Sequence, residues 1–126
     1  MSAPLPTTGQ VHEAMRRRDH ATAEALLGRI LERDPAQAQS WRDLGLIRLA
    51  AGRKALAVEA FERALAAGLP PLSIAFDHAR ALSDIGRHEE AEALAAEAQA
   101  RRPRDYALTN LRGVLLKRMG RLREAV

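Results

Sequence analysis

The chain has 126 residues, a length that suits one domain with a substantial core. Hydrophobic residues make up 47% of it but aromatic residues only 3%, so alanine and leucine must supply the core and favour closely packed helices. The absence of cysteine excludes disulfides, thiolate metal sites and a catalytic thiol. No apolar run approaches the roughly 18 residues that a membrane span needs. Residues 1–10 lack the basic and apolar regions of a secretory signal. We therefore expect a cytoplasmic protein that does not enter a membrane.

The basic residues are concentrated at the C-terminal end. Residues 1–100 carry 12 basic and 14 acidic side chains, whereas residues 101–126 carry eight basic and two acidic ones. A basic end can bind nucleic acid or an acidic partner, but a solvated helical face is the commoner explanation. The shortage of aromatic residues for base stacking also weighs against single-stranded nucleic acid.

The predicted elements are pairs of helices joined by tight turns. Residues 1–8 are expected to form a flexible lead-in, and the folded domain is expected to cover residues 9–126. We expect helices at residues 9–17, 20–33, 38–51, 54–67, 72–85, 88–101, 106–119 and from 122 onward.

The pattern of helices and turns repeats with a fixed period, equal to the number of residues from Gly52 to Gly86. Gly120 stands one period after Gly86, and Arg18 stands one period before Gly52, where another turn is expected. The glycines suit the left-handed backbone conformation that closes a helix. A fixed period in the range of about 20–50 residues indicates a solenoid of stacked units. Alanines have the same spacing, at Ala23, Ala57, Ala91 and Ala125.

At this point the sequence resembles the tetratricopeptide repeat (TPR) family, whose pattern is W-x2-L-G-x2-Y, A-x3-F and P within a repeat of about 34 residues. Arg48 replaces the usual tyrosine, and the closing proline is displaced to Pro70. The resemblance implies an all-α, right-handed solenoid (TPR superhelix) of antiparallel helix pairs with about 3.5 repeats. The units are expected at residues 4–37, 38–71, 72–105 and 106–126, the last one truncated. The matching residues of the second unit are Trp41, Leu44, Gly45, Ala57, Phe61 and Ala64.

The residues that could carry chemistry do not form a catalytic pattern. The four histidines lack metal-ligand spacing, no serine has a G-x-S-x-G setting, and the glycines are spread one per turn rather than in a phosphate loop. We therefore expect no enzyme activity, no catalytic residue, no cofactor and no metal.

The TPR resemblance instead implies a protein-interaction module. In that family the first helix of each unit lines a concave groove that takes an extended peptide or a partner helix. Both charge signs among a few apolar residues suit such a ligand. The expected groove residues are Arg42, Asp43, Leu46, Phe76, Asp77, Arg80, Asn110, Val114 and Lys117, with Leu111 and Arg118 beside them.

Two alternatives follow from the incomplete fourth unit. An end helix needs a polar cap or a neighbour, and Leu111, Val114, Leu115 and Leu116 would otherwise lack part of their cover. We then expect the chain to be a fragment. One alternative is that it is the N-terminal recognition domain of a larger bacterial enzyme of glycosyl- or sulfotransferase type. In the other reading the uncapped ends mediate homo-oligomerisation, which a charge at Leu115 would abolish.

Overall fold

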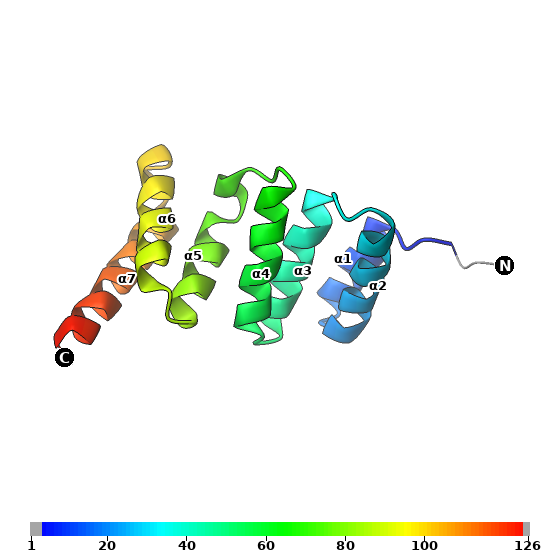
Figure 1. Ribbon diagram of the computed structural model, residues 1–126, viewed down its shortest axis with the longest axis horizontal. Coiled ribbons are helices and arrows are strands. Elements are labelled where there is room, and N and C mark those ends of the chain that lie inside the picture. The colour runs from blue at the N-terminus through cyan, green and yellow to red at the C-terminus, as the bar shows by residue number, and fades with distance from the viewer. Residues whose placement is uncertain (1–3, 125–126) are drawn as a thin grey trace. The chain divides into compact units, whose positions relative to one another are not determined.

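The computed structural model describes residues 4–124, which form seven α-helices and one 3-10 turn and contain no strand (Figure 1). They divide into two compact units, unit 1 ending at Leu69 and unit 2 beginning at Pro70. Successive helices within each unit pack side by side. The all-α class and the solenoid of helix pairs expected from the sequence are confirmed. Ala125, the last member of the periodic alanine set, lies outside the described residues.

Unit 1 contains two helix pairs. Its core is a continuous cluster of buried aliphatic side chains, of which Val11, Leu27 and Ile47 are the most deeply buried large residues. A capping box begins the first helix, because Thr7 Oγ1 accepts from Gln10 N (3.2 Å) while Thr7 N donates to Gln10 Oε1 (2.9 Å). The sequence analysis did not identify this cap. The helices are α1 (Thr8–Arg16), α2 (His20–Arg33), α3 (Ala38–Ala50) and α4 (Lys54–Ala66).

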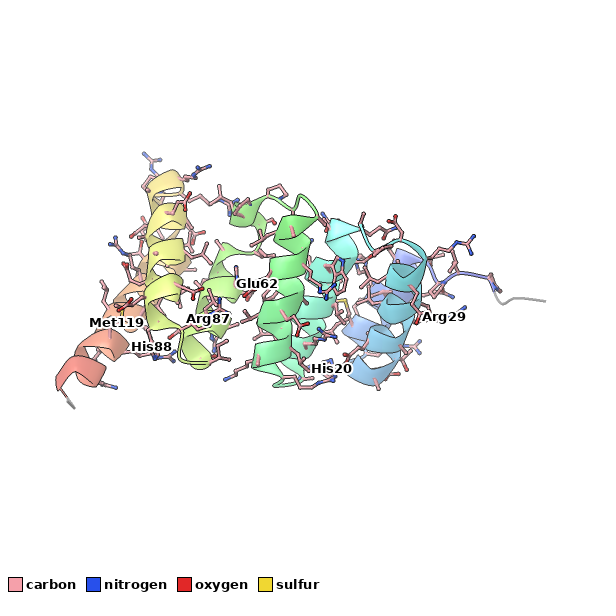
Figure 2. The ribbon with its side chains drawn as sticks, in the orientation of Figure 1. His20, Arg29, Glu62, Arg87, His88 and Met119 are labelled. Carbon is pink, nitrogen blue, oxygen red and sulfur yellow. The ribbon has the colours of Figure 1, made fainter. Side chains whose placement is uncertain are left out.

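The lead-in to α1 is tied to the rest of unit 1 by a hydrogen bond. Arg29 of α2 (labelled in Figure 2) donates from Nη2 to the carbonyl oxygen of Pro4 over 3.2 Å. The segment before α1 therefore has a partner on the neighbouring helix.

Unit 2 begins with a short 3-10 turn rather than with a full helix. We expected a helix from residue 72, but α5 begins only at Ala75. The reason lies in the two prolines: Pro71 opens the 3-10 turn, Ser73 Oγ donates to Pro70 O (2.7 Å), and the turn ends at Ile74. The elements are η1 (Pro71–Ser73), α5 (Ala75–Asp84), α6 (His88–Arg101) and α7 (Tyr106–Glu124).

Three equivalent turns close the first helices of their pairs with the same geometry. Arg18, Gly52 and Gly86 have positive φ values of 58°, 81° and 93°. The residue after each turn donates its amide hydrogen to a carbonyl five residues earlier, as in a Schellman motif. The turn expected at Arg18 is therefore present although no glycine stands there. These bonds are Asp19 N to Ala14 O (2.9 Å), Arg53 N to Arg48 O (2.8 Å) and Arg87 N to Leu82 O (2.9 Å).

The fourth expected turn, at Gly120, does not form. α7 continues through this residue to Glu124, so the predicted division into helices 106–119 and 122 onward is wrong. A glycine inside a helix costs about 1 kcal/mol relative to alanine but does not end the helix. A turn becomes favourable only when the residues that follow it pack back on the preceding helix.

Three contacts position the helices of the α3–α4 pair in unit 1. The buried Phe61 ring of α4 packs directly against the backbone of Gly45 in α3, as the small residue at this position predicts. Trp41 belongs to the first turn of α3 and is half-buried. Its Nε1 donates to Pro35 O over 2.8 Å. The guanidinium carbon of Arg63 lies 5.0 Å from the centre of its ring, a cation–π contact.

Arg48, which departs from the TPR pattern, joins two helix pairs. Its Nε donates to Glu24 Oε1 on α2 (3.2 Å), and its Nη1 donates to Leu56 O (3.2 Å). Arg53 also contacts the Glu24 carboxylate. The side chains of Arg48 and Glu24 are 19% and 24% exposed, so this ion pair is partly shielded from water. An electrostatic contact thus stands where the family pattern has tyrosine.

Candidate functional site

A hollow of about 400 Å³ lies between α5 and α7 within unit 2. We call it the α5–α7 groove. Four of the residues that the sequence analysis selected line it: Phe76, Arg80, Asn110 and Val114. Its other lining residues are Ala107, Leu111 and Arg118.

The groove combines an apolar floor with a polar rim. Leu111 is 7% exposed and Phe76 half-buried, whereas Val114 is 47% exposed. Arg80 and Asn110 are exposed and offer hydrogen-bond donors from opposite helices, with Asn110 also offering an acceptor. This arrangement can hold an apolar side chain while polar groups contact a peptide backbone or a carboxylate.

Arg118 connects α7 to the end of α5. Its Nη1 donates to Ser83 Oγ (2.9 Å) and to Asp84 Oδ1 (3.0 Å). His88, at the start of α6 (Figure 2), places Nδ1 3.2 Å from the same hydroxyl. These contacts fix the relative position of three helices and so shape the groove.

The Ser83, Asp84 and His88 cluster contains the residue types of a catalytic triad but not its geometry. The carboxylate of Asp84 binds Arg118, and Ser83 is only 2% exposed, so a substrate would not reach its hydroxyl. Among residues 4–124, no three His, Asp or Glu side chains are grouped so that they could hold a metal ion. The cluster therefore acts as a structural connection.

Two further predicted residues of unit 2 do not line the groove. Asp77 follows Phe76 on α5 and is half-buried, and Lys117 is exposed on α7. Ala107, in contrast, lines the groove but was not selected. Its spacing from Asn110, Leu111 and Val114 places it on their face of the helix, so the helical period could have identified it.

The predicted residues of unit 1 lie on α3. Asp43 is buried, and its Oδ2 lies 3.4 Å from His12 Nε2 on α1. The first helices of the two pairs in unit 1, α1 and α3, therefore meet at these two residues. Arg42 Nη1 donates to Gln39 Oε1 over 2.9 Å, and Leu46 is half-buried. Asp43 is therefore already engaged by a neighbouring helix, while Arg42 faces the solvent-accessible part of α3.

The basic C-terminal part is partly neutralised by acidic residues of unit 2. Arg112 Nε donates to Glu92 Oε1 over 2.7 Å, and Arg118 pairs with Asp84 as described above. These pairs are half-shielded, since the acidic partners are 19% and 14% exposed. They support a structural role for these two charges.

α7 distributes its leucines differently from the expectation. Leu111 and Leu115 are buried, with Leu115 at 0% exposure, because α7 packs on both α5 and α6. Val114 and Leu116 are 47% and 49% exposed. Leu115 is therefore the wrong residue for a surface charge substitution, and Leu116 is the appropriate one. No helix in the described part of the chain has the length and apolar content of a membrane span.

Comparisons with known proteins agree with this architecture. The model of a family described as tetratricopeptide repeat matches residues 8–70 and 76–126. The unmatched residues 71–75 coincide with η1 and the start of α5. No curated protein matches the chain.

Several solved structures resemble the chain at low sequence identity. The crystal structure of YrrB, a TPR protein with an unusual peptide-binding site, has a TM-score of 0.81 at 21% identity, over 91% of this chain and 59% of that chain. The Yersinia enterocolitica type III secretion chaperone SycD, in complex with a peptide of the translocator YopD, has a TM-score of 0.74 at 16% identity. That match covers 86% of this chain and 88% of SycD. A second SycD structure has a TM-score of 0.69 at 17% identity, over 92% and 81% of the two chains.

Proposed function

The chain belongs to the tetratricopeptide repeat family, and we propose that it is a non-catalytic protein-interaction module that binds an extended peptide or a partner helix. The observation that carries this proposal is the α5–α7 groove, in which Phe76 and Val114 offer apolar surface beside Arg80 and Asn110. The peptide-binding site named for YrrB and the YopD peptide bound to SycD are properties of those proteins, and they support the same class of ligand here.

The chemistry of the groove favours a short apolar anchor with polar neighbours. A volume of about 400 Å³ accommodates one or two side chains. Apolar contact with Phe76 and Val114 would supply most of the affinity, since buried anchors dominate binding. Arg80 and Asn110 would select an acceptor-rich backbone or an acidic side chain.

Two matched variants of α7 test this proposal. Val114 lines the groove and Leu116 does not, yet the two side chains are almost equally exposed. Peptides selected from a random display library on the wild-type protein would be titrated against Val114→Glu and Leu116→Glu. We expect roughly tenfold or greater loss of affinity for the first variant and little change for the second. Equal loss in both, or no loss in either, would contradict the assignment of the groove.

Self-association through α7 is a second candidate function. Besides Val114 of the groove, α7 has two exposed large apolar side chains among its described residues, Tyr106 at 78% and Leu116 at 49%. A second copy of the chain could cover them. Sedimentation velocity over a range of concentrations would detect the dimer, and Leu116→Glu should return it to a monomer. A mass that stays monomeric at high protein concentration would rule this candidate out.

A further inference from the structure

An apolar crevice separates η1 and α5 from the C-terminal part of α6. Because α5 and α6 run antiparallel, the start of the first meets the end of the second at the upper edge of unit 2 in Figure 1. The crevice encloses about 140 Å³ and shares no residue with the α5–α7 groove. Its lining is formed by Pro70, Pro71, Leu72, Ala75, Leu94 and Ala98, together with Glu97 and Arg101.

The internal repeat shows which residues stand at the equivalent positions one period earlier. Ala75 stands one full period after Trp41, and Glu97 stands one full period after Arg63. In unit 1 the indole Nε1 of Trp41, in the first turn of α3, donates a hydrogen bond to Pro35 O, and the Arg63 guanidinium lies over the ring. The equivalent position of unit 2 has only a methyl group. The crevice therefore lies at the sequence position where the preceding repeat has an indole.

The size and polarity of the crevice suit an aromatic ring. A cavity of about 150 Å³ lined by apolar side chains is large enough to bind benzene, and this crevice has nearly that volume. Ala75 and Ala98 are 3% and 2% exposed. A ring in the crevice would be shielded from water where it meets the apolar lining residues.

The charged side chains at the mouth of the crevice favour particular residues beside a bound ring. Arg101 Nη2 lies 3.6 Å from Glu97 Oε1, but the two side chains are 65% and 69% exposed, so the pair is weak and Arg101 can turn to a ligand. Arg102 and Arg104 follow in the exposed segment after α6. Three arginines against Glu97 and Asp105 leave a net positive charge near the mouth, which favours acidic residues next to the inserted ring.

We propose that this crevice is a second binding site, which takes an aromatic side chain from an acidic stretch of a partner protein. The inserted ring takes the position that Trp41 takes in the preceding repeat, and Arg101 contacts the acidic residues that flank it. The site is separate from the groove of the proposed function, so either can be correct without the other.

The probe for this site is the peptide acetyl-Glu-Glu-Trp-Glu-Glu-amide, titrated into the isotopically labelled protein and followed by two-dimensional amide NMR. We expect the largest shifts at the amides of Leu72, Ala75, Leu94 and Ala98. Replacing the tryptophan of the peptide by alanine should weaken binding roughly tenfold or more. Shifts that map elsewhere, or equal binding of the alanine peptide, would overturn the proposal.

Two protein variants test the role of the crevice itself. Ala75→Trp fills the space with the protein's own indole and should abolish binding, whereas Ala25→Trp, at an exposed site on α2, should not. Val114→Glu in the α5–α7 groove should also leave this binding unchanged, which separates the two sites. Peptide binding that survives in a folded Ala75→Trp protein would refute the site.

A charge variant provides the test if Ala75→Trp does not fold. Arg101→Glu changes an exposed residue, so the fold should be retained. It should weaken the acidic tryptophan peptide about threefold and leave the affinity for N-acetyl-tryptophan amide unchanged. Equal effects on both probes, or no effect on the acidic peptide, would argue against the assigned contact.

Discussion

Gly45 and Phe61 are in such close contact that the backbone of one helix supports the ring of the next. A Cβ atom added to Gly45 would lie 2.4 Å from Cε1 and 2.5 Å from Cδ1 of Phe61. The ring is fully buried and has no solvent-exposed direction in which to move. The approach of α3 and α4 in unit 1 therefore depends on the absence of a side chain at position 45.

Gly45→Ala should destabilise unit 1 although alanine is the better helix former. Overpacking of this kind costs about 1–3 kcal/mol, which exceeds the gain of about 1 kcal/mol in helix propensity. Urea denaturation followed by circular dichroism would measure the change. Gly28→Ala in α2 is the matched control, because nothing lies within 4 Å of its added Cβ. That variant should be stabilised, and a stabilised Gly45→Ala protein would contradict the packing argument.

Glu24→Ala should destabilise the contact between the helix pairs of unit 1. The substitution leaves Arg48, whose side chain is 19% exposed, without its carboxylate partner. Loss of a charged partner at a partly buried site costs about 1–3 kcal/mol. Glu59→Ala, at an exposed site on α4, should change the free energy of unfolding by no more than about 0.5 kcal/mol. Equal effects in chemical denaturation would mean that the pair contributes no more than a surface charge.

Arg18→Gly should stabilise the protein. Arg18 has a φ of 58°, a conformation that costs a residue with a Cβ atom about 1–2 kcal/mol. Glycine removes this strain but makes the unfolded chain more flexible, so the net gain should be about 0.5–1 kcal/mol. Gly52→Arg, at the equivalent turn, is the reciprocal variant and should be destabilised. Thermal unfolding of both proteins decides the point, and shifts of the same sign would contradict it.

Asp19 should make the stability of the protein depend on pH in the acid range. The side chain of Asp19 caps α2, and hydrogen bonds from the side chain and backbone of Thr22 lower its pKa below the ordinary value. A lowered pKa in the folded state contributes stability that is complete above the unfolded pKa of about 4. This contribution is lost as the pH falls through the lowered pKa.

Asp19→Asn tests this contribution because asparagine also caps helices but carries no charge. The wild-type protein should have the higher melting temperature at pH 7, and the difference should shrink as the pH is lowered below about 4. Melting curves of the two proteins from pH 7 to well below pH 4 would show it. A difference that stays constant with pH would exclude the carboxylate charge as its cause.

The repeat and most helix boundaries could be predicted because they depend on local chemistry and on a period visible in the sequence. The groove residues Phe76, Arg80, Asn110 and Val114 could be selected because the TPR resemblance implies that the first helix of each unit lines a groove. The helical period then places Phe76 with Arg80, and Asn110 with Val114, on one face of each helix. Their role in binding stays a prediction.

Other features depend on contacts that the sequence does not specify. Glu24 and Arg48 are 24 residues apart and belong to different helix pairs, so their ion pair follows only from how α2 packs on α3. The crevice at Ala75 lies where the preceding repeat has a tryptophan and where two prolines delay the start of α5. A crevice of this kind has no local sequence signature.

Gly120 shows that a glycine in this sequence setting does not by itself end a helix. It is flanked by Met and Arg, much as Gly52 and Gly86 are flanked by one apolar residue and Arg, yet its backbone continues a helix. Glycine fits both the left-handed turn conformation and the helical one. Packing contacts of the neighbouring residues, rather than the glycine, therefore decide where a helix of this chain ends.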